Sequence, residues 1–157
     1  METTTTEITM EADASVRVRP MARGDLPAVT ALCTQLGYPE TEEAITHRFE
    51  LLLASPHDTL LVAQDGEERV VGWIHLAGRV LLEAEPFAQV AGIVVDERVR
   101  GKSVGRALMA AAEAWADERG YDEVRLWSNI VRERAHRFYE GLGYEHVKTS
   151  KVFRKTL

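Results

Sequence analysis

The strongest chemical signal in the sequence is a glycine-bearing basic turn that follows an apolar run. The run Val90-Ala91-Gly92-Ile93-Val94-Val95 precedes the segment Arg100-Gly101-Lys102-Ser103-Val104-Gly105-Arg106, which opens an amphipathic stretch. A buried strand that leads directly into a helix leaves unpaired N–H groups at the first turn of that helix, and such groups bind phosphate oxygens. The two glycines would let an anion approach the backbone, and the three basic side chains add positive charge. The segment predicts a phosphate-binding turn, with a solvated basic loop as the alternative.

A nucleotide-binding P-loop is excluded at the same place. The residues Gly101-Lys102-Ser103 match the end of the pattern G-x-x-x-x-G-K-[ST]. The first glycine of that pattern would stand at position 96, where the chain has Asp96. An aspartate there removes the glycine-dependent geometry and adds a negative charge beside the phosphates.

The strands and helices predicted around this turn have the order expected for an α/β protein. Alternating and striped apolar residues predict a single mixed sheet with helices, in the order β-α-α-β-β-β-α-β-α-β-β. We expect helices that end at Gly37, Pro56, Gly120 and Gly143, the first of them capped by Asp25, and a hairpin turn at Asp65-Gly66. The expected strands cover residues 16–19, 59–63, 70–76, 90–95, 124–127, 144–148 and 151–153. These elements predict one domain over residues 16–157, after a flexible Thr-rich tail over residues 1–15.

Composition and charge exclude several classes of protein. Hydrophobic residues make up 45% and charged residues 28% of the 157 residues, which is ordinary for a globular chain. The net charge of −6 disfavours nucleic-acid and anionic-membrane partners, since both need surplus Lys and Arg. The single cysteine, Cys33, cannot form an intramolecular disulfide, and no signal peptide or membrane-spanning run is present, so we expect a cytoplasmic protein. The five histidines lack metal-ligand spacing, and we predict no metal.

Two segments together resemble the GNAT superfamily of N-acetyltransferases. Arg100 to Leu108 is similar to the acetyl-CoA motif of that family, [RQ]-x-x-G-x-[GA] at a strand-to-helix turn. Ala135-His136-Arg137-Phe138-Tyr139-Glu140 with Gly143-Tyr144 is similar to its later pattern A-x-x-F-Y-E…G-[FY]. The order of elements agrees from Val16 to Leu157, and two motifs at the right separation are more specific than either one alone.

The resemblance implies a division of labour among these residues. The pyrophosphate of acetyl-CoA would bind the backbone amides of Gly101, Lys102, Ser103, Val104, Gly105 and Arg106, with Arg100 beside them. The pantetheine arm would pair with the backbone of Ile93, Val94 and Val95, where the fourth and fifth strands separate. An amine would attack the thioester directly, which suits a chain whose one cysteine lies far from the motif in sequence. Tyr139 would protonate the leaving thiolate as general acid, although a core tyrosine is the alternative.

The chain departs from the family pattern at two positions. Ser103 stands where the family usually has its middle glycine, and it supplies a hydroxyl donor instead. Arg132 stands where many members have an asparagine that contacts CoA, while Asn129 lies three residues earlier. Asn129 is therefore either a cofactor contact or a turn-forming residue.

The general base is left open by the sequence. An amine of the lysine type has a pKa near 10.4 and must lose a proton before it attacks. Glu83, Glu85 and His75 are candidates, and a chain of water molecules is another.

Three functions fit the resemblance. The first is transfer of an acetyl group to a primary amine of a small molecule; Leu36-Gly37-Tyr38-Pro39 and the form of the second motif look most like small bacterial members that include aminoglycoside acetyltransferases. The second is acetylation of a protein N-terminus or lysine. The third is a non-catalytic acyl-CoA sensor, against which the retained Tyr139 argues. The resemblance also makes a homodimer possible.

Overall fold

The computed structural model describes residues 15–101 and 103–157. The predicted tail over residues 1–15, apart from Ser15, and the predicted cofactor contact Lys102 lie outside the described residues. Contacts divide the chain into two compact units, residues 1–126 and residues 127–157. Each unit is described by itself, and a single domain over residues 16–157 stays a prediction.

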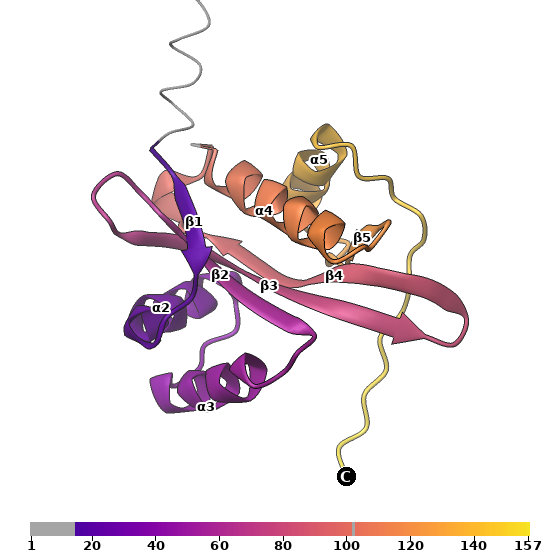
Figure 1. Ribbon diagram of the computed structural model, residues 1–157, viewed down its shortest axis with the longest axis horizontal. Helices are drawn as coiled ribbons and strands as arrows, with labels where there is room; N and C mark the ends of the chain where they lie inside the picture. Colours follow the sequence, from indigo (N-terminus) through magenta and orange to yellow (C-terminus); the bar gives the residue numbers. More distant parts are fainter. Residues whose placement is uncertain (1–14, 102) are drawn as a thin grey trace, which may run out of the picture. The chain divides into compact units, whose positions relative to one another are not determined.

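The first unit is built on one mixed sheet of five strands, which confirms the predicted α/β class (Figure 1). The strands lie in the order β1-β2-β3-β4-β5, antiparallel except for the parallel pair β4–β5. Their bounds are Arg17–Pro20, Asp58–Gln64, Val70–Leu81, Ala84–Val95 and Val124–Leu126. The turn at Asp65 closes the β2–β3 hairpin as predicted, because its carboxylate accepts hydrogen bonds from the N–H groups of Glu67 and Arg69.

Strands β3 and β4 are longer than the sequence pattern predicts, at twelve residues each. They continue to a turn between Leu81 and Ala84 that contains no glycine, asparagine or proline. Pro86 lies inside β4 and does not end it. The pattern missed this extension because the turn lacks the residues by which hairpins are recognised in a sequence.

The edge of β4 opens at the end that leads into the basic turn. Strand β5 pairs with β4 only from Ala88 to Val90. Beyond Val90, β4 continues to Val95 with β3 on one side and no ladder partner on the β5 side among the described residues. A register shift between His75 and Leu76 of β3 bulges β4 at Ala91, where this opening begins.

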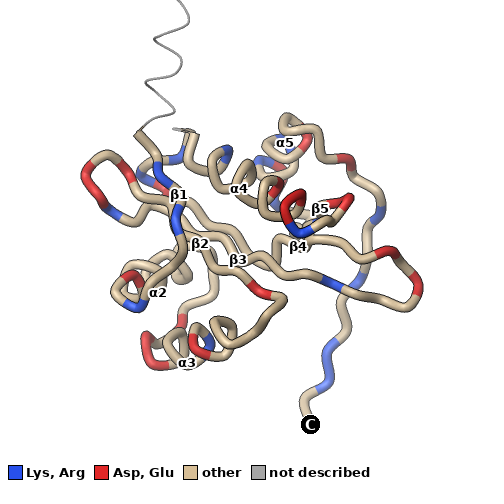
Figure 2. Tube along the Cα trace, viewed as in Figure 1, with Lys and Arg blue, Asp and Glu red and all other residues tan. Residues whose placement is uncertain are grey.

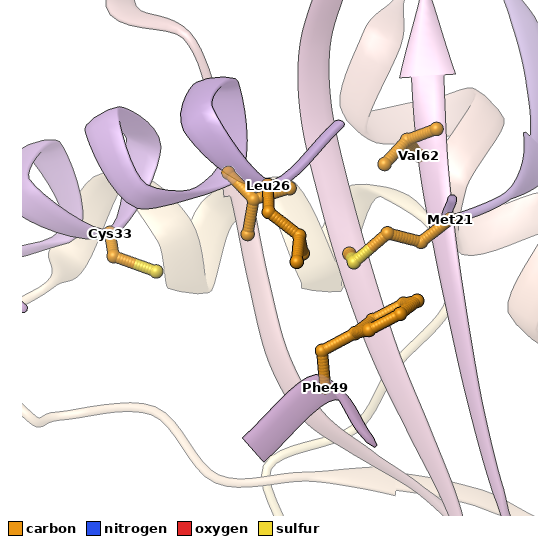
Figure 3. Packing of buried hydrophobic residues seen from close by; sticks show 6 residues of the cluster. Met21, Leu26, Cys33, Phe49 and Val62 are labelled. Carbon is orange, nitrogen blue, oxygen red and sulfur yellow. The ribbon is translucent and has the colours of Figure 1, made fainter. Parts of the chain in front are cut away.

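Helices cover both faces of this sheet (Figure 1). Helices α2 (Leu26–Leu36) and α3 (Glu42–Leu53) lie on one face, and α4 (Val104–Glu118) lies on the other. Figure 3 shows the core between the sheet and the first pair, with Phe49 of α3 and Val62 of β2 facing Met21, Leu26 and Cys33. On the α4 side, a Cβ at Gly72 of β3 would lie 3.1 Å from Cδ1 of Leu108 and 3.3 Å from Cγ1 of Val104, both in α4, so the close packing of α4 on β3 favours glycine there.

Asp25 does not cap α2, contrary to its predicted role. Its side chain makes no cap hydrogen bond to the helix. Its carboxylate instead accepts from both terminal nitrogens of Arg19, at 2.7 and 2.8 Å, and from the N–H of Ala22. A buried carboxylate is stabilised more by a bidentate arginine than by one backbone amide, so Asp25 pairs with Arg19 rather than with the start of α2.

The second unit contains helix α5 (Glu133–Gly141) and an extended C-terminal segment. The predicted strands over residues 144–148 and 151–153 are not formed; this part of the described chain has neither helix nor strand. A strand exists only when another strand satisfies its backbone N–H and C=O groups, and an alternating sequence cannot supply that partner. In the described part of the chain, no helix is both apolar and long enough to cross a membrane.

Candidate functional site

The predicted phosphate-binding turn forms the start of α4, and that start is left uncapped. Gly101 has φ 83° and Ser103 has φ 69° and ψ 5°, both in the left-handed region. The Ser103 hydroxyl makes no cap hydrogen bond, and the first bond of the helix runs from the N–H of Ala107 to the carbonyl of Ser103. The N–H groups of Val104, Gly105 and Arg106 therefore have no acceptor within the helix.

The charge around this turn favours an anion. Arg100 and Arg106 are exposed, and the first turn of α4 contains no acidic residue. The unpaired amides carry the partial positive charge of the helix dipole, to which the two guanidinium groups add. Val104 is buried and anchors the turn against the sheet. The geometry is that of a backbone cradle for phosphate.

Asp96 holds the loop that leads into the cradle. Its side chain is 5% exposed, accepts from the N–H of Arg98 at 3.0 Å and forms an ion pair with that residue's guanidinium at 2.7 Å. Hydrogen bonds from Arg98, which outweigh the effect of burial, lower the pKa of Asp96 to about 2. Gln35 of α2 bonds the same loop, with its Oε1 accepting from the N–H of Glu97. The residue that excluded the P-loop is thus a structural anchor.

The backbone of β4 next to the cradle presents the open edge described above. Ile93, Val94 and Val95 all lie beyond the last pair with β5. Val94 is buried, while Ile93 and Val95 are half-buried. An extended arm that carries amides could add to this edge as a strand does.

A pocket of about 380 Å³ lies on the face of the sheet that α2 and α3 cover. Glu40 and Arg48 form an ion pair in it, with 2.9 Å between carboxylate and guanidinium. The ring of Trp73 packs on Gly92, where a Cβ would lie 3.0 Å from the indole. The pocket is lined by Cys33, Leu36, Tyr38, Glu40, Ile45, Arg48, Trp73, Ala91 and Gly92. Through Ala91 and Gly92 it reaches the point at which β4 opens.

Cys33 lies in this pocket, although the sequence separates it from the motif by about seventy positions. The folding of α2 over the sheet brings it there. Its side chain is nevertheless almost fully buried, and burial is the largest cause that raises the pKa of its thiol. A thiol that stays protonated is a poor nucleophile.

The three candidate bases lie in very different places. His75 of β3 pairs in register with Gly92, and its Nε2 lies 2.7 Å from Oδ1 of Asp58. Ser55 donates to the other oxygen of Asp58 at 2.6 Å. Burial raises the pKa of Asp58, but the hydrogen bonds from Ser55 and His75 together lower it below its ordinary value.

Glu83 and Glu85, by contrast, are exposed at the β3–β4 turn. Glu85 is separated from Gly92 by seven positions of one strand, or about 23 Å.

In the second unit, Tyr139 is half-buried on α5 beside aromatic rings. Its ring centroid lies 5.3 Å from that of Phe138 and 6.3 Å from that of Tyr144. Burial raises the pKa of Tyr139, and nearby Arg132 partly opposes the effect. The phenol is therefore protonated at neutral pH.

Asn129 adopts the turn-forming role that the sequence left open. Its Oδ1 accepts from the N–H of Val131 at 3.1 Å, and its carbonyl oxygen accepts from the N–H of Arg132. A contact with the cofactor stays a prediction.

The sequence did not single out the lining of the pocket. Trp73, Glu40 and Arg48 come from β3, the α2–α3 loop and α3, and no local pattern links them. The one usable signal was the short stretch Leu36-Gly37-Tyr38-Pro39, which contributes two of the lining residues. Within the described residues no group of three or more His, Cys, Asp or Glu side chains could hold a metal ion.

Comparison with known proteins agrees with this geometry. The model of the acetyltransferase (GNAT) family matches residues 27–144. An aminoglycoside N(6')-acetyltransferase type 1 of Serratia marcescens is 31% identical over 142 residues, which cover 85% of this chain and 94% of the relative. An aminoalkylphosphonate N-acetyltransferase of Salmonella typhimurium is 33% identical over 133 residues, covering 82% and 85%.

Solved structures share the fold. The aminoglycoside N-acetyltransferase AAC(6')-Iy, in complex with CoA, aligns with a TM-score of 0.80 at 20% identity and covers 90% of this chain and 95% of its own.

Proposed function

The chain belongs to the GNAT family and is an acetyl-CoA-dependent N-acetyltransferase. We propose that its acceptor is the primary amine of a small molecule, and that this amine attacks the thioester of acetyl-CoA directly, without an acyl-enzyme. The observation that carries the proposal is the uncapped start of α4 beside the open edge of β4. Both are parts of one continuous strand–turn–helix, and together they suit a pyrophosphate joined to an extended amide-bearing arm.

The cofactor would bind along this unit. The amides from Gly101 to Arg106 would hold the pyrophosphate, with Arg100 adding charge. The arm would pair with Ile93, Val94 and Val95, which directs the thioester toward Ala91 and Gly92. When bound, acetyl-CoA supplies the activated acetyl group.

The size and charge of the pocket support a small cationic acceptor. A volume of about 380 Å³ lies in the range that small-molecule sites occupy, roughly 300–1,000 Å³. Glu40 offers a carboxylate at its wall, and the net charge of −6 attracts cations to the protein as a whole. Relatives named for aminoglycosides and aminoalkylphosphonates both act on small amines, which supports the same class here.

Direct attack is supported by the state of Cys33. It is the one cysteine of the chain, and its raised pKa keeps it a thiol at neutral pH. An acetyl-enzyme would need the thiolate form, which burial disfavours.

His75 is the general base that we propose. In the tautomer that donates from Nε2 to Asp58, His75 keeps a lone pair on Nδ1 that could accept the proton of the amine, and Asp58 would stabilise the positive charge that results. Its register partner Gly92 lines the pocket. His75→Gln should lower kcat by roughly 10²–10⁴, the span of a positioned general base. His47→Gln, at an exposed histidine of α3, is the matched control; a kcat for His75→Gln within threefold of that control would leave the base to water.

The leaving thiolate would take its proton from Tyr139, whose raised pKa keeps the phenol a donor at neutral pH.

Turnover with a panel of amines tests the proposed acceptor. Acetyl-CoA is supplied with an aminoglycoside, an aminoalkylphosphonate, a peptide with a free N-terminus or a lysine peptide, and free thiol is followed. We expect thiol release with a small amine. Release with peptides alone would instead make the chain a protein acetyltransferase. Binding of acetyl-CoA without release in any arm would make it a sensor.

Two further expectations accompany this function. A cytoplasmic location is consistent with the free, buried Cys33, which needs no oxidising compartment. A homodimer is the second expectation, and it is carried over from the resemblance to the family.

A further inference from the structure

The pocket between α2, α3 and the sheet has a lining that is mostly apolar and carries no net charge. Among the described residues that line it, Glu40 and Arg48 are the charged ones, and their formal charges cancel. The rest are uncharged, and most of them are apolar. Sites lined in this way bind the apolar body of a ligand over a wide area and orient it with a few polar groups. The lining therefore favours an acceptor with an apolar body.

Trp73 is the largest side chain of this lining, and packing fixes its position. Its indole packs on β4, where a Cβ at Gly92 would lie 3.0 Å from Cη2 and 3.1 Å from Cζ3. The same side chain packs against the core cluster that contains Met21, Cys33 and Val62. Its Nε1 is buried with no hydrogen-bond partner among the described residues, so packing alone holds the ring. A fixed aromatic ring in a pocket favours an apolar or aromatic group on the ligand.

Glu40 and Arg48 neutralise each other at this pocket. Oε1 of Glu40 lies 2.9 Å from Nη1 of Arg48. Burial is the largest cause that raises the pKa of Cys33, and Glu40 raises it further while Arg48 lowers it, so the two charges act on this side chain in opposite directions. Acidic and basic residues both occur along α3, the helix that contains Arg48 (Figure 2). An ammonium group that approaches Glu40 therefore competes with Arg48 and meets its like charge.

This arrangement disfavours a polycationic acceptor. An aminoglycoside carries several ammonium groups on hydroxylated rings, so it needs several carboxylates and hydrogen-bond partners in its site. Glu40 is the one carboxylate among the described residues of the lining, and it is already paired with Arg48. Similarity to relatives named for aminoglycosides therefore does not extend to the composition of this pocket.

We propose that the acceptor is a monoamine with an uncharged, apolar body, and that Trp73 and the Glu40–Arg48 ion pair determine this selectivity. The proposal rests on the function proposed above, because it takes this pocket as the acceptor site. The apolar body would contact Trp73 and Ile45, and the amine would lie near Gly92, the register partner of the proposed base.

Thiol release with three amines tests the selectivity. Phenethylamine carries an apolar ring, ethylamine lacks that ring, and kanamycin is a polycationic aminoglycoside. We expect kcat/KM for phenethylamine to exceed that for ethylamine by about 10–100-fold, the effect of burying one ring, and to exceed that for kanamycin as well. An equal or higher kcat/KM for ethylamine or kanamycin would overturn this proposal and leave the proposed function intact. Release with peptides alone would overturn the proposed function.

Arg48→Gln tests the role of the ion pair. The substitution leaves Glu40 unpaired and gives the lining a net negative charge, so kcat/KM for kanamycin relative to phenethylamine should rise by roughly threefold to tenfold. Arg23→Gln is the matched control, because it breaks a pair with Glu50 of α3, at 2.7 Å and outside the lining. The ratio should not change in this control. An unchanged ratio in Arg48→Gln, or an equal rise in Arg23→Gln, would overturn the role of the pair.

Trp73→Leu tests the role of the ring. The substitution keeps an apolar side chain, so kcat/KM should fall more for phenethylamine than for ethylamine, and an equal fall would make Trp73 a structural residue only. The rise in melting temperature with acetyl-CoA shows whether the variant is folded. Titration calorimetry of phenethylamine and kanamycin into CoA-bound wild-type protein measures the same preference without turnover. Tighter binding of kanamycin would overturn the proposal even if no amine released thiol.

Discussion

The helices on the two faces of the sheet differ in how their first backbone amides are satisfied. On the face that we propose for the acceptor (the acceptor face), α3 begins after Thr41, whose hydroxyl accepts from the N–H of Ala44 at 3.1 Å, and Glu42 and Glu43 stand in its first turn. On the face that we propose for the cofactor (the cofactor face), α4 begins after Ser103, whose hydroxyl makes no cap hydrogen bond, and its first turn has no acidic residue. The first amides of α3 therefore have a side-chain cap, and those of α4 do not.

The two faces also differ in how their sites are assembled. The cradle is one stretch of backbone between Val95 and Arg106, so its chemistry depends on φ angles and free amides. The pocket collects side chains from α2, α3, β3 and β4. Substitutions should therefore act on the cradle through backbone shape and on the pocket through individual groups.

The largest effect on kcat should come from Tyr139→Phe, a substitution in α5 rather than at the start of α3 or α4. The substitution removes only the hydroxyl, so loss of the acid should lower kcat by roughly 10²–10⁴, or about 3–5 kcal/mol. Affinity for acetyl-CoA should change little, because the thiolate forms only in the transition state. The measurement is kcat on one amine, normalised by titration with CoA. A packing role alone predicts instead about 1 kcal/mol of lost stability with turnover intact.

Gly105→Leu should break the cofactor face while sparing the acceptor face. Wild-type protein at a hundredfold excess of acetyl-CoA over Kd should gain about 2.7 kcal/mol of stability. The leucine side chain would occupy the place of a phosphate, so the gain and the rise in melting temperature should disappear. A matched change at the acceptor face, Ile45→Val, should keep the rise. If acetyl-CoA raised the melting temperature of Gly105→Leu as it does that of wild type, the phosphate site would have to lie elsewhere. A wild-type melting temperature that acetyl-CoA does not change would contradict cofactor binding altogether.

Substitutions at the N-cap residues of α3 and α4 should change the stability of the protein in opposite directions. Thr41→Ala removes a working cap and should destabilise the protein by about 1 kcal/mol. Ser103→Gly relieves a left-handed serine and should stabilise it by about 1 kcal/mol. Urea unfolding of both variants gives the two signs, and the Kd for CoA should be unchanged in Thr41→Ala. A destabilising Ser103→Gly would show that the hydroxyl has a partner in solution.

The smallest effect at neutral pH should be the loss of stability on substitution of Asp96, which holds the loop before α4. The pKa of Asp96 is about 2 in the folded protein, below the ordinary 3.8 of an unfolded chain. Its contribution to stability is therefore complete above the ordinary value and is lost as pH falls toward the folded one. Asp96→Asn should be less stable than wild type at neutral pH, and the difference should shrink near pH 2. Unfolding by urea at both pH values measures it; a constant difference would assign the effect to packing.

The sequence predicted the fold class and the strand–turn–helix from β4 into α4 well, because both depend on neighbours along the chain, while the cofactor contacts themselves stay a prediction. The β4–turn–α4 unit, the α2 and α4 helices and the Asp65 hairpin all carry their signals within about ten residues. The predicted fifth strand and helix α5 also appear, each within a few residues of its expected bounds. The cap predicted at Asp25 was wrong because the carboxylate pairs with Arg19 instead, and the cap pattern of the helix alone does not include Arg19.

What the sequence by itself determined is the turn from β4 into α4, since glycine spacing, basic charge and the start of a helix are local properties. Only the tertiary structure decided the pocket that we propose for the acceptor, because Cys33, Glu40, Trp73 and Gly92 meet through packing between distant elements. The same reason explains why the strands predicted over residues 144–148 and 151–153 were wrong: an alternating sequence allows a strand, but a strand forms only where a partner strand satisfies its backbone N–H and C=O groups.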